Sequence, residues 1–293
     1  NLSGIEYFTA LTYLDCNYNN IQTIDVSQNK SLTKLALHDN KLTHLDISAN
    51  KELFNLTFSK NQISTIDLSQ NKKLHYVVAD QNLLTSIDFS ANPELEMIYC
   101  GNNSLTTLNV SNLPNLLDLN CTNTNISVLD VTSNPKLNML YFNNAKLTTL
   151  DLSNNPLLKN LNVGSNQLTT LDLSNNPLLE LVFIEFNPLT SLNVQNGNNK
   201  NFKLYKTTGK NAETQEYTSF LNNSNLRCIK VDDVAYSNTH WTNIKDATAT
   251  FNIECTGELT LPSNNFTVET KGESCLGENN GEINIKATET FSY

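Results

Sequence analysis

Leucine returns at a fixed interval of 21 residues through most of this chain, and this period limits the possible folds more than any other feature. It opens nine successive units, at Leu11, Leu32, Leu53, Leu74, Leu95, Leu116, Leu137, Leu158 and Leu179. Each unit follows the pattern LxxLxΦxxNxΦxxΦxΦSxNxx, where Φ is apolar, and LKNLNVGSNQLTTLDLSNNPL shows it in full. A period free of insertions predicts that every unit follows the same backbone path.

The apolar residues of the segment LxxLxΦ alternate, which predicts a short strand with one face turned inward. A single unit cannot bury that face, whereas stacked units bury one another. The second half of the unit, as in LTTLDLSNN, nearly repeats the first and predicts a second strand-like segment on the opposite side. We therefore expect a mainly β, right-handed solenoid of about nine turns with parallel strands and little helix.

An asparagine follows the first strand of most units, where the chain turns a corner. Its amide can satisfy backbone groups of neighbouring turns, which predicts an asparagine ladder. The ladder comprises Asn19, Asn40, Asn61, Asn82, Asn103, Asn166 and Asn187. Thr124 and Ala145 interrupt it in adjacent turns, so we expect weaker hydrogen bonding there.

Three regions follow from where the register holds and where it is lost. Residues 1–199 form the solenoid, with 1–10 as an N-terminal cap or partial turn. We interpret residues 200–255 as a C-terminal cap over the last open edge, with Trp241 packed in its core. Residues 256–293 alternate like strands and predict the start of a β-rich, adhesin-like sandwich module. We expect the natural chain to continue beyond it, and the abrupt start inside a repeat-like pattern indicates a mature or trimmed chain.

The six cysteines fall into groups by position. Cys16, Cys100 and Cys121 occupy the inward Φ slot of the first strand, so we expect buried free thiols, although a disulfide between the last two is conceivable. Cys228 and Cys255 bracket the cap, and we predict that they form a disulfide, which implies an oxidising, exported setting. Cys275 is left over, and its partner is expected beyond residue 293.

Composition narrows the partners. The formal net charge of -10 and the absence of a basic tract argue against nucleic acid. No run of about 20 apolar residues predicts a membrane span. The sequence lacks nucleophile-elbow, phosphate-loop, dinucleotide and zinc-protease motifs, and no cysteine–histidine spacing suits a structural zinc. We interpret the histidines as solvated surface groups and predict that the chain is not an enzyme; they are His38, His44, His75 and His240.

The second half of the unit carries a column of outward acidic residues: Asp25, Asp46, Asp67, Asp88, Asp130, Asp151 and Asp172, with Asn109 and Asn193 in the same slot. Stacked carboxylates about 5 Å apart repel one another unless hydrogen bonds or a cation compensate. We favour hydrogen bonds over calcium and predict no resident metal or cofactor. The neighbouring threonine column, at Thr23, Thr65, Thr107, Thr149 and Thr170, suggests an ice-binding face, which the adjacent charges make a weaker interpretation.

The outward positions of the first strand vary from turn to turn and are rich in aromatic and methionine residues. Such residues are enriched in recognition surfaces, so this variable face is the predicted ligand-binding site. Its candidate residues are Tyr13, Tyr18, His38, Tyr76, Met97, Tyr99, Met139, Tyr141, Phe183 and Phe186. The alternative is that Tyr99 and Tyr141 only pack across the sheet.

These motifs resemble the leucine-rich-repeat family, in its internalin-like class with 21-residue repeats. The segment LxxLxCxxN is similar to the cysteine-substituted form of that repeat, LDVSQN and LDLSNNP resemble repeats of secreted Bacteroidota proteins, and LSGIEYFTALTYLDC resembles an internalin first turn. The resemblance covers about two thirds of the chain and implies the fold more strongly than the function.

The sequence accordingly predicts a secreted or cell-surface bacterial recognition or adhesion protein. It is expected to be a monomer and to bind a protein or a polysaccharide through the variable face. Two alternatives stay open: a spacer that binds nothing, and an accessory binding module of a larger secreted enzyme.

Overall fold

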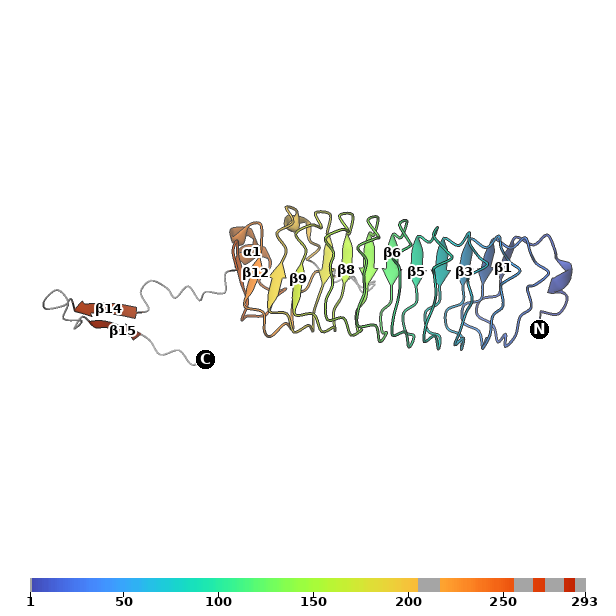
Figure 1. Ribbon diagram of the computed structural model, residues 1–293, viewed down its shortest axis with the longest axis horizontal. Coiled ribbons are helices and arrows are strands. Elements are labelled where there is room, and N and C mark those ends of the chain that lie inside the picture. Colours follow the sequence, from blue (N-terminus) through green and yellow to red (C-terminus); the bar gives the residue numbers. More distant parts are fainter. Residues whose placement is uncertain (1, 205–216, 256–265, 272–281, 288–293) are drawn as a thin grey trace, which may run out of the picture. The chain divides into compact units, whose positions relative to one another are not determined.

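The computed structural model describes residues 2–204, 217–255, 266–271 and 282–287. The chain divides into two compact units, Asn1–Ile253 and Glu254–Tyr293, which are described separately below. The first unit contains the repeats, and its coils stack side by side (Figure 1).

The first half of each repeat contributes one strand to a nine-stranded parallel sheet. Tyr13 pairs with Lys34 and Leu14 with Leu35, so each strand faces its equivalent in the next repeat. The strands are β1 (Tyr13–Asp15), β2 (Lys34–Ala36), β3 (Asn55–Thr57), β4 (Tyr76–Val78), β5 (Met97–Tyr99), β6 (Asp118–Asn120), β7 (Met139–Tyr141), β8 (Asn160–Asn162) and β10 (Leu181–Phe183). This register confirms the predicted parallel coil.

The opposite side of the coil carries a second, four-stranded parallel sheet only near its C-terminal end. Its strands are β9 (Thr170–Asp172), β11 (Ser191–Asn193), β12 (Cys228–Lys230) and β13 (Thr250–Asn252). In the earlier coils the equivalent segment forms no strand within the described residues. The prediction of a second strand in every turn was therefore wrong for the earlier coils. There, asparagine side chains such as Asn50 hydrogen-bond to the backbone of the preceding coil near this segment.

The solenoid extends further than the period indicates. Isolated bridges join Phe183 to Ser219 and Phe220 to Lys245, while β12 and β13 extend the second sheet. About 11 turns result, where the sequence predicted nine, so much of the expected cap continues the coil. The period hid these turns because Val182 and Thr218, which are hydrogen-bonded neighbours, lie 36 residues apart.

The core is a continuous column of apolar side chains between the two sides of the coil. Leu32, Leu35 and Leu37 have no exposed surface, and their equivalents along the repeats repeat this burial. Burying one leucine stabilises a fold by about 1.5–3 kcal/mol, and here the covering atoms belong to the coils above and below. No single repeat can therefore be stable alone.

The predicted asparagine ladder is present, and its hydrogen bonds connect successive coils. Asn61 donates from Nδ2 to the carbonyls of Leu37 and Phe58 at 2.9 Å each, and its Oδ1 accepts from the Leu42 amide at 2.9 Å. Thr124 breaks this pattern, because its hydroxyl donates only within its own turn, to the Cys121 carbonyl at 2.9 Å. The predicted weakening at this point is confirmed.

A second asparagine ladder, which sequence reasoning missed, holds the opposite corner. Asn50 donates from Nδ2 to the Val26 carbonyl at 3.0 Å and to the Asn29 carbonyl at 2.8 Å, both in the preceding coil. The same slot is filled by Asn29, Asn71, Asn92, Asn134, Asn155 and Asn176. Asn29 starts the series by donating to the carbonyls of Ile5 and Phe8, which ties the short helix η1 (Ile5–Tyr7) to the first coil.

The C-terminal coils are closed by aromatic packing around the single tryptophan. Trp241 follows helix α1 (Val234–His240), is fully buried and stacks on Phe202 with ring centroids 5.4 Å apart. Its predicted place in the core is confirmed. Cys228 and Cys255 are both disulfide-bonded, which supports the predicted covalent closure, whereas Cys275 lies outside the described residues.

The remaining described elements are a second short helix, η2 (Asn199–Asn201), in the first unit, and a hairpin in the second. The hairpin pairs β14 (Phe266–Lys271) with β15 (Glu282–Ala287) in antiparallel register. Its assignment to an adhesin-like sandwich remains a prediction.

Candidate ligand-binding face

The variable face is formed by the outward side chains of the first sheet, and the structure brings five of the ten predicted residues together at its centre. Tyr76 faces Met97 across β4 and β5, and Asp118 of β6 lies between Met97 and Met139. Tyr99 and Tyr141 flank Asn120 in the neighbouring column. The central cluster, as we call it, consists of Tyr76, Met97, Tyr99, Asp118, Met139 and Tyr141.

The other predicted residues lie toward the two ends of the sheet. At the N-terminal end the rings of Tyr18 and His38 meet edge-on at 5.0 Å, and the Lys34 ammonium lies 4.6 Å from the Tyr13 ring centroid. Tyr18 is 73% exposed. Phe183 and Phe186 are in the coil of β10, at the C-terminal end of the sheet. The candidates therefore form a central cluster and two end groups rather than one patch.

One aromatic residue of this surface escaped the sequence prediction. The Phe54 ring stacks on His75 at 4.1 Å, and its centroid lies 5.3 Å from that of Tyr76. The Tyr76 hydroxyl donates to the Glu96 carboxylate at 3.0 Å. Phe54 occupies the second position of its repeat and precedes the strand, so it lies outside the strand positions from which the variable face is predicted. It was recognisable because His75 follows it by one period.

The predicted aromatic residues differ in whether packing within the sheet explains their presence. The Phe183 ring packs over Gly164, where an added Cβ would meet the ring at 2.9 Å, so Phe183 fills space within the sheet. Phe186 is 56% exposed and has a left-handed backbone with φ of 57°. Tyr18 is in the same repeat position with φ of 56°. Aromatic residues are disfavoured in that conformation, and Phe186 makes no ring contact with the described residues, whereas Tyr18 meets His38 edge-on.

Two carboxylates border Tyr99 on the variable face. Asp118 is 9% exposed, and burial raises its pKa. Burial also raises the pKa of Asp80, although its Oδ1 accepts a hydrogen bond from the Gly101 amide at 2.9 Å. The pKa of Tyr99 is raised first by its own burial and then by the charges of Asp118 and Asp80. The centre of this face is therefore acidic and only partly accessible to water.

The regular face, on the opposite side, is held by hydrogen bonds within each turn. Asp151 Oδ1 accepts from the Ser153 amide at 2.9 Å, and this bond holds the pKa of Asp151 below its ordinary value. Asn109 makes the equivalent bond to the Ser111 amide at 3.0 Å. These Asx turns supply the hydrogen-bonding explanation of the acidic column.

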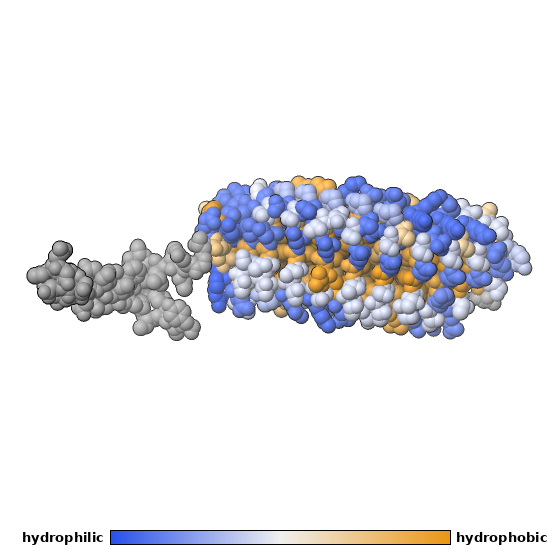
Figure 2. Space-filling model, viewed as in Figure 1, coloured by the Kyte–Doolittle hydropathy of each residue, from blue (hydrophilic) through white to orange (hydrophobic). Residues whose placement is uncertain are grey.

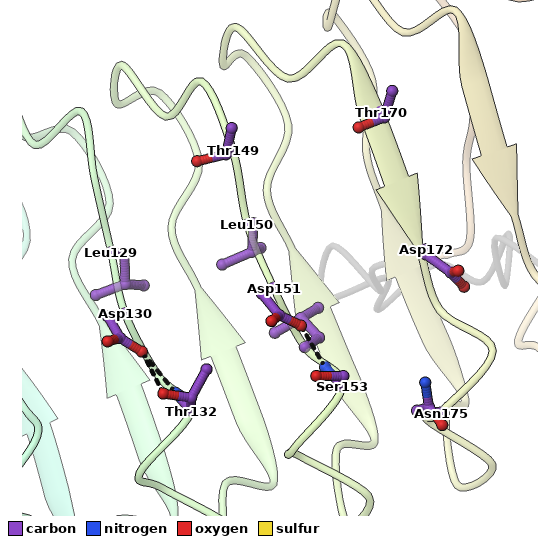
Figure 3. A pocket seen from close by; sticks show the side chains of 11 residues that line it. Leu129, Asp130, Thr132, Thr149, Leu150, Asp151, Ser153, Thr170, Asp172 and Asn175 are labelled. Carbon is purple, nitrogen blue, oxygen red and sulfur yellow. Dashed lines mark hydrogen bonds between the residues drawn. The ribbon is translucent and has the colours of Figure 1, made fainter.

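A shallow groove of about 520 Å³ lies over part of the regular face, and Thr149, Leu150 and Asp151 are among the residues that line it (Figure 3). Figure 2 shows an apolar stripe along the solenoid between polar margins. In the described part of the chain, no group of three or more His, Cys, Asp or Glu residues is arranged to hold a metal ion.

The inward cysteines lie where the sequence placed them, whereas only two of the four histidines are the solvated surface groups that it predicted. His44 and His240 are exposed, while His38 and His75 are half-buried against aromatic rings. Cys16, Cys100 and Cys121 are buried free thiols, and the Sγ atoms of the last two are 2.7 Å apart. Across the described residues, no helix is long and apolar enough to cross a membrane.

Comparison with known proteins agrees with this architecture. The Leucine Rich Repeat family model matches residues 146–169 and 167–189. The functional domain of InlJ from Listeria monocytogenes, which includes a cysteine ladder, is 31% identical with a TM-score of 0.67 and aligns over 79% of this chain and 56% of that one. No curated protein sequence matches the chain.

Two more distant solved structures share the fold. A leucine-rich-repeat protein of Leptospira interrogans is 20% identical, with a TM-score of 0.62, over 85% of this chain and 62% of that one. The plant peptide hormone receptor RGFR1, in complex with RGF2, is 17% identical, with a TM-score of 0.59, over 78% of this chain and 45% of that one. This chain thus spans less than two thirds of each of these structures.

A parallel β-solenoid with one regular and one variable face belongs to a class of scaffolds that typically bind other molecules and are not enzymes. Within that class, this chain is an internalin-like leucine-rich-repeat protein.

Proposed function

We propose that this chain is an exported recognition protein that binds a protein ligand through the variable face. The observation that carries the proposal is the central cluster, which places two tyrosines and two methionines in register over β5 and β7. Aromatic and methionine side chains give large contact areas and are enriched in binding hot spots.

The contrast between the two faces supports this choice of surface. The acidic column of the regular face is engaged in Asx turns, and the same residue types recur from turn to turn. The variable face changes in each coil while the same backbone supports it. The regular face shows that the scaffold does not require aromatic side chains, so their recurrence on the variable face favours recognition, although Phe183 and Phe54 also pack within the sheet.

The cysteines support an exported location. Cys228 and Cys255 are each disulfide-bonded, and such bonds persist mainly in oxidising compartments. Internalin-like solenoids act as binding scaffolds, so we assign no catalytic role to the chain. Adhesion to a polysaccharide, a spacer role and service as a module of a larger enzyme are the competing functions.

The test is a screen of protein and glycan arrays with the wild-type chain, in the presence of calcium and of a chelator. Tyr99→Ala combined with Tyr141→Ala should weaken protein binding by about 100-fold, as loss of hot-spot aromatics does. The matched control is Thr149→Ala combined with Thr170→Ala on the regular face, which should bind like wild type. Thermal unfolding of each variant confirms that the fold is retained.

Each outcome separates the candidates. Protein binding that the tyrosine pair abolishes supports the proposal. Binding to glycans alone favours the adhesion alternative, and no binding to either array favours a spacer. Protein binding that persists without the tyrosines, or that the threonine pair abolishes, overturns the assignment of the face.

A further inference from the structure

Asp118 is the one member of the central cluster whose chemistry the fold leaves incomplete. It projects from β6 onto the variable face, between Met97 of β5 and Met139 of β7. The residue is only 9% exposed, yet its side chain makes no hydrogen bond or ion pair with any described part of the chain. Its charge contributes to the raised pKa of Tyr99.

Other carboxylates of the solenoid are provided for by the chain itself. Asp80 accepts from the Gly101 amide, and Asp130 accepts from the amide and hydroxyl of Thr132. Three described ion pairs use lysines elsewhere: Lys73 with Glu52, Lys200 with Asp233 and Lys203 with Glu180. Asp232, in the last coils, also has a buried oxygen, Oδ2, without a hydrogen-bond partner, but among the described acids of the variable face only Asp118 is buried and lacks one.

A carboxylate that loses much of its water and gains no donor in return destabilises the free protein. The repeat does not require an acid there, because Asn55 and Asn160 occupy the same column on β3 and β8. The presence of an acid at a position where it destabilises the free protein is explained if another molecule supplies the hydrogen-bond donor that the fold does not. The site lacks the further ligands that a metal ion needs within the described residues.

The surroundings indicate the chemistry of that donor. The thioether side chains of Met97 and Met139 offer apolar walls for an aliphatic stem, and the Tyr99 ring is available to a cation. A long side chain with a cationic end fits both features. The net charge of -10 adds long-range attraction for a basic partner.

We infer that Asp118 anchors a lysine or arginine side chain of the protein ligand, which inserts between Met97 and Met139 beside Tyr99. This inference rests on the proposed function and adds to it the charge and the position of the central contact. The guanidinium or ammonium group donates to the Asp118 carboxylate, which thereby gains the partner that the fold withholds.

The experiment is a selection of random linear peptides displayed on phage, carried out in parallel on three proteins. These are the wild-type chain, Asp118→Asn and the control Asp130→Asn. The control removes one negative charge from the same repeat on the opposite face, and its amide can keep the Asx turn, as Asn109 does. Asp118→Asn keeps the size of the side chain, and Asn160 shows that the slot accepts it.

Peptides selected by wild type and by Asp130→Asn should share a lysine or arginine at one aligned position, and Asp118→Asn should lose that preference. A selected peptide should bind Asp118→Asn about 30-fold more weakly than wild type. Replacing its conserved cation by glutamine should cost a similar factor on wild type and little on Asp118→Asn, which is the signature of a direct pair.

The contrary results are distinguishable. A cationic preference that survives in Asp118→Asn, or selected peptides without a common cation, overturns this inference and leaves the proposed function in place. Failure of wild type to select any peptide overturns protein recognition, and the inference falls with it. Equal loss of binding in Asp130→Asn assigns the effect to overall charge and overturns the role of Asp118.

Discussion

Asn112 makes the hydrogen bond that its neighbour Leu113 cannot make. Leu113 occupies the asparagine slot of the second ladder, and Asn112 donates from Nδ2 to the Phe89 carbonyl at 3.3 Å and the Ser90 carbonyl at 2.9 Å. The bond to the Phe89 carbonyl is therefore made from the adjacent position, in addition to the one that this carbonyl accepts from the Asn92 amide, and such a bond contributes about 1 kcal/mol.

Asn112→Ala should consequently lower the free energy of unfolding by about 1–2 kcal/mol. The matched control is Asn154→Ala, because Asn154 has the same position in its repeat while Asn155 still serves the buried carbonyl of Val131. That control should change the free energy by less than about 0.5 kcal/mol. Urea denaturation followed by circular dichroism measures both, and equal losses would show that Asn112 does not serve the ladder.

Asp118→Asn should raise the free energy of unfolding by about 1 kcal/mol at pH 7, because it removes a buried charge that has no partner. The pKa of Asp118 is raised in the folded state, so its penalty is present above that pKa and disappears as the pH falls toward the ordinary carboxyl value. The advantage of the variant should therefore shrink on acidification.

Asp130→Asn should affect the free energy of unfolding in the opposite direction from Asp118→Asn. Hydrogen bonds from Thr132, first from its hydroxyl and then from its amide, lower the pKa of Asp130, so its ionised form stabilises the fold above the ordinary carboxyl value. The variant should show no gain at pH 7. Thermal unfolding midpoints across the acidic range test both, and a gain for Asp118→Asn that is independent of pH would contradict the role of its charge.

The repeat made some features predictable from sequence and concealed others. Side chains spaced by one period must occupy equivalent places, so the inward position of Leu53 and the ladder bonds of Asn61 followed directly. The last coils did not follow, because the 36-residue interval between Val182 and Thr218 breaks that equivalence. The isolation of Asp118 depends on which side chains flank it one period away, and Met97 and Met139 were visible there before the structure.

Gly101 and Gly164 should differ in their tolerance of a side chain. An alanine Cβ at Gly101 would lie 2.8 Å from the Thr122 carbonyl oxygen, which is backbone and cannot move without disturbing the next coil. At Gly164 the nearest atom, at 2.9 Å, belongs to the Phe183 ring, which can rotate. We expect Gly101→Ala to cost about 2–3 kcal/mol and Gly164→Ala about 1 kcal/mol.

The double variant Gly164→Ala with Phe183→Leu tests the cause of the second effect. Relief of the ring contact should make the two changes less than additive in denaturation experiments, since they share one space. No such second substitution can help Gly101→Ala, because the atom that its Cβ would meet is the backbone oxygen of Thr122. Strict additivity at Gly164 would show that Phe183 is not what limits the space.

Phe186→Asn should stabilise the protein by about 1 kcal/mol, because asparagine adopts the left-handed backbone more readily than phenylalanine. Asn123, in the same repeat position with φ of 57°, shows that the solenoid accepts it. Phe54→Asn is the control, since Phe54 is also an exposed aromatic and has no left-handed backbone. That control should lose stability, because it removes the stacking of Phe54 on His75. A gain in both variants would show that replacing an exposed aromatic by a polar residue, and not the left-handed backbone, causes the effect.

Ala145→Asn should strengthen the solenoid at the point where the first ladder is interrupted. In intact turns the asparagine donates to a carbonyl of the preceding coil and one of its own, and accepts an amide of the preceding coil, as Asn166 does with Phe142, Val163 and Leu147. The same geometry would give a new asparagine at Ala145 the Cys121 and Phe142 carbonyls and the Ile126 amide. We expect a gain of about 1 kcal/mol by urea denaturation. Ala145→Leu is the control: it adds bulk without hydrogen bonds, and an equal gain from it would mean that packing, not the ladder, limits stability at this turn.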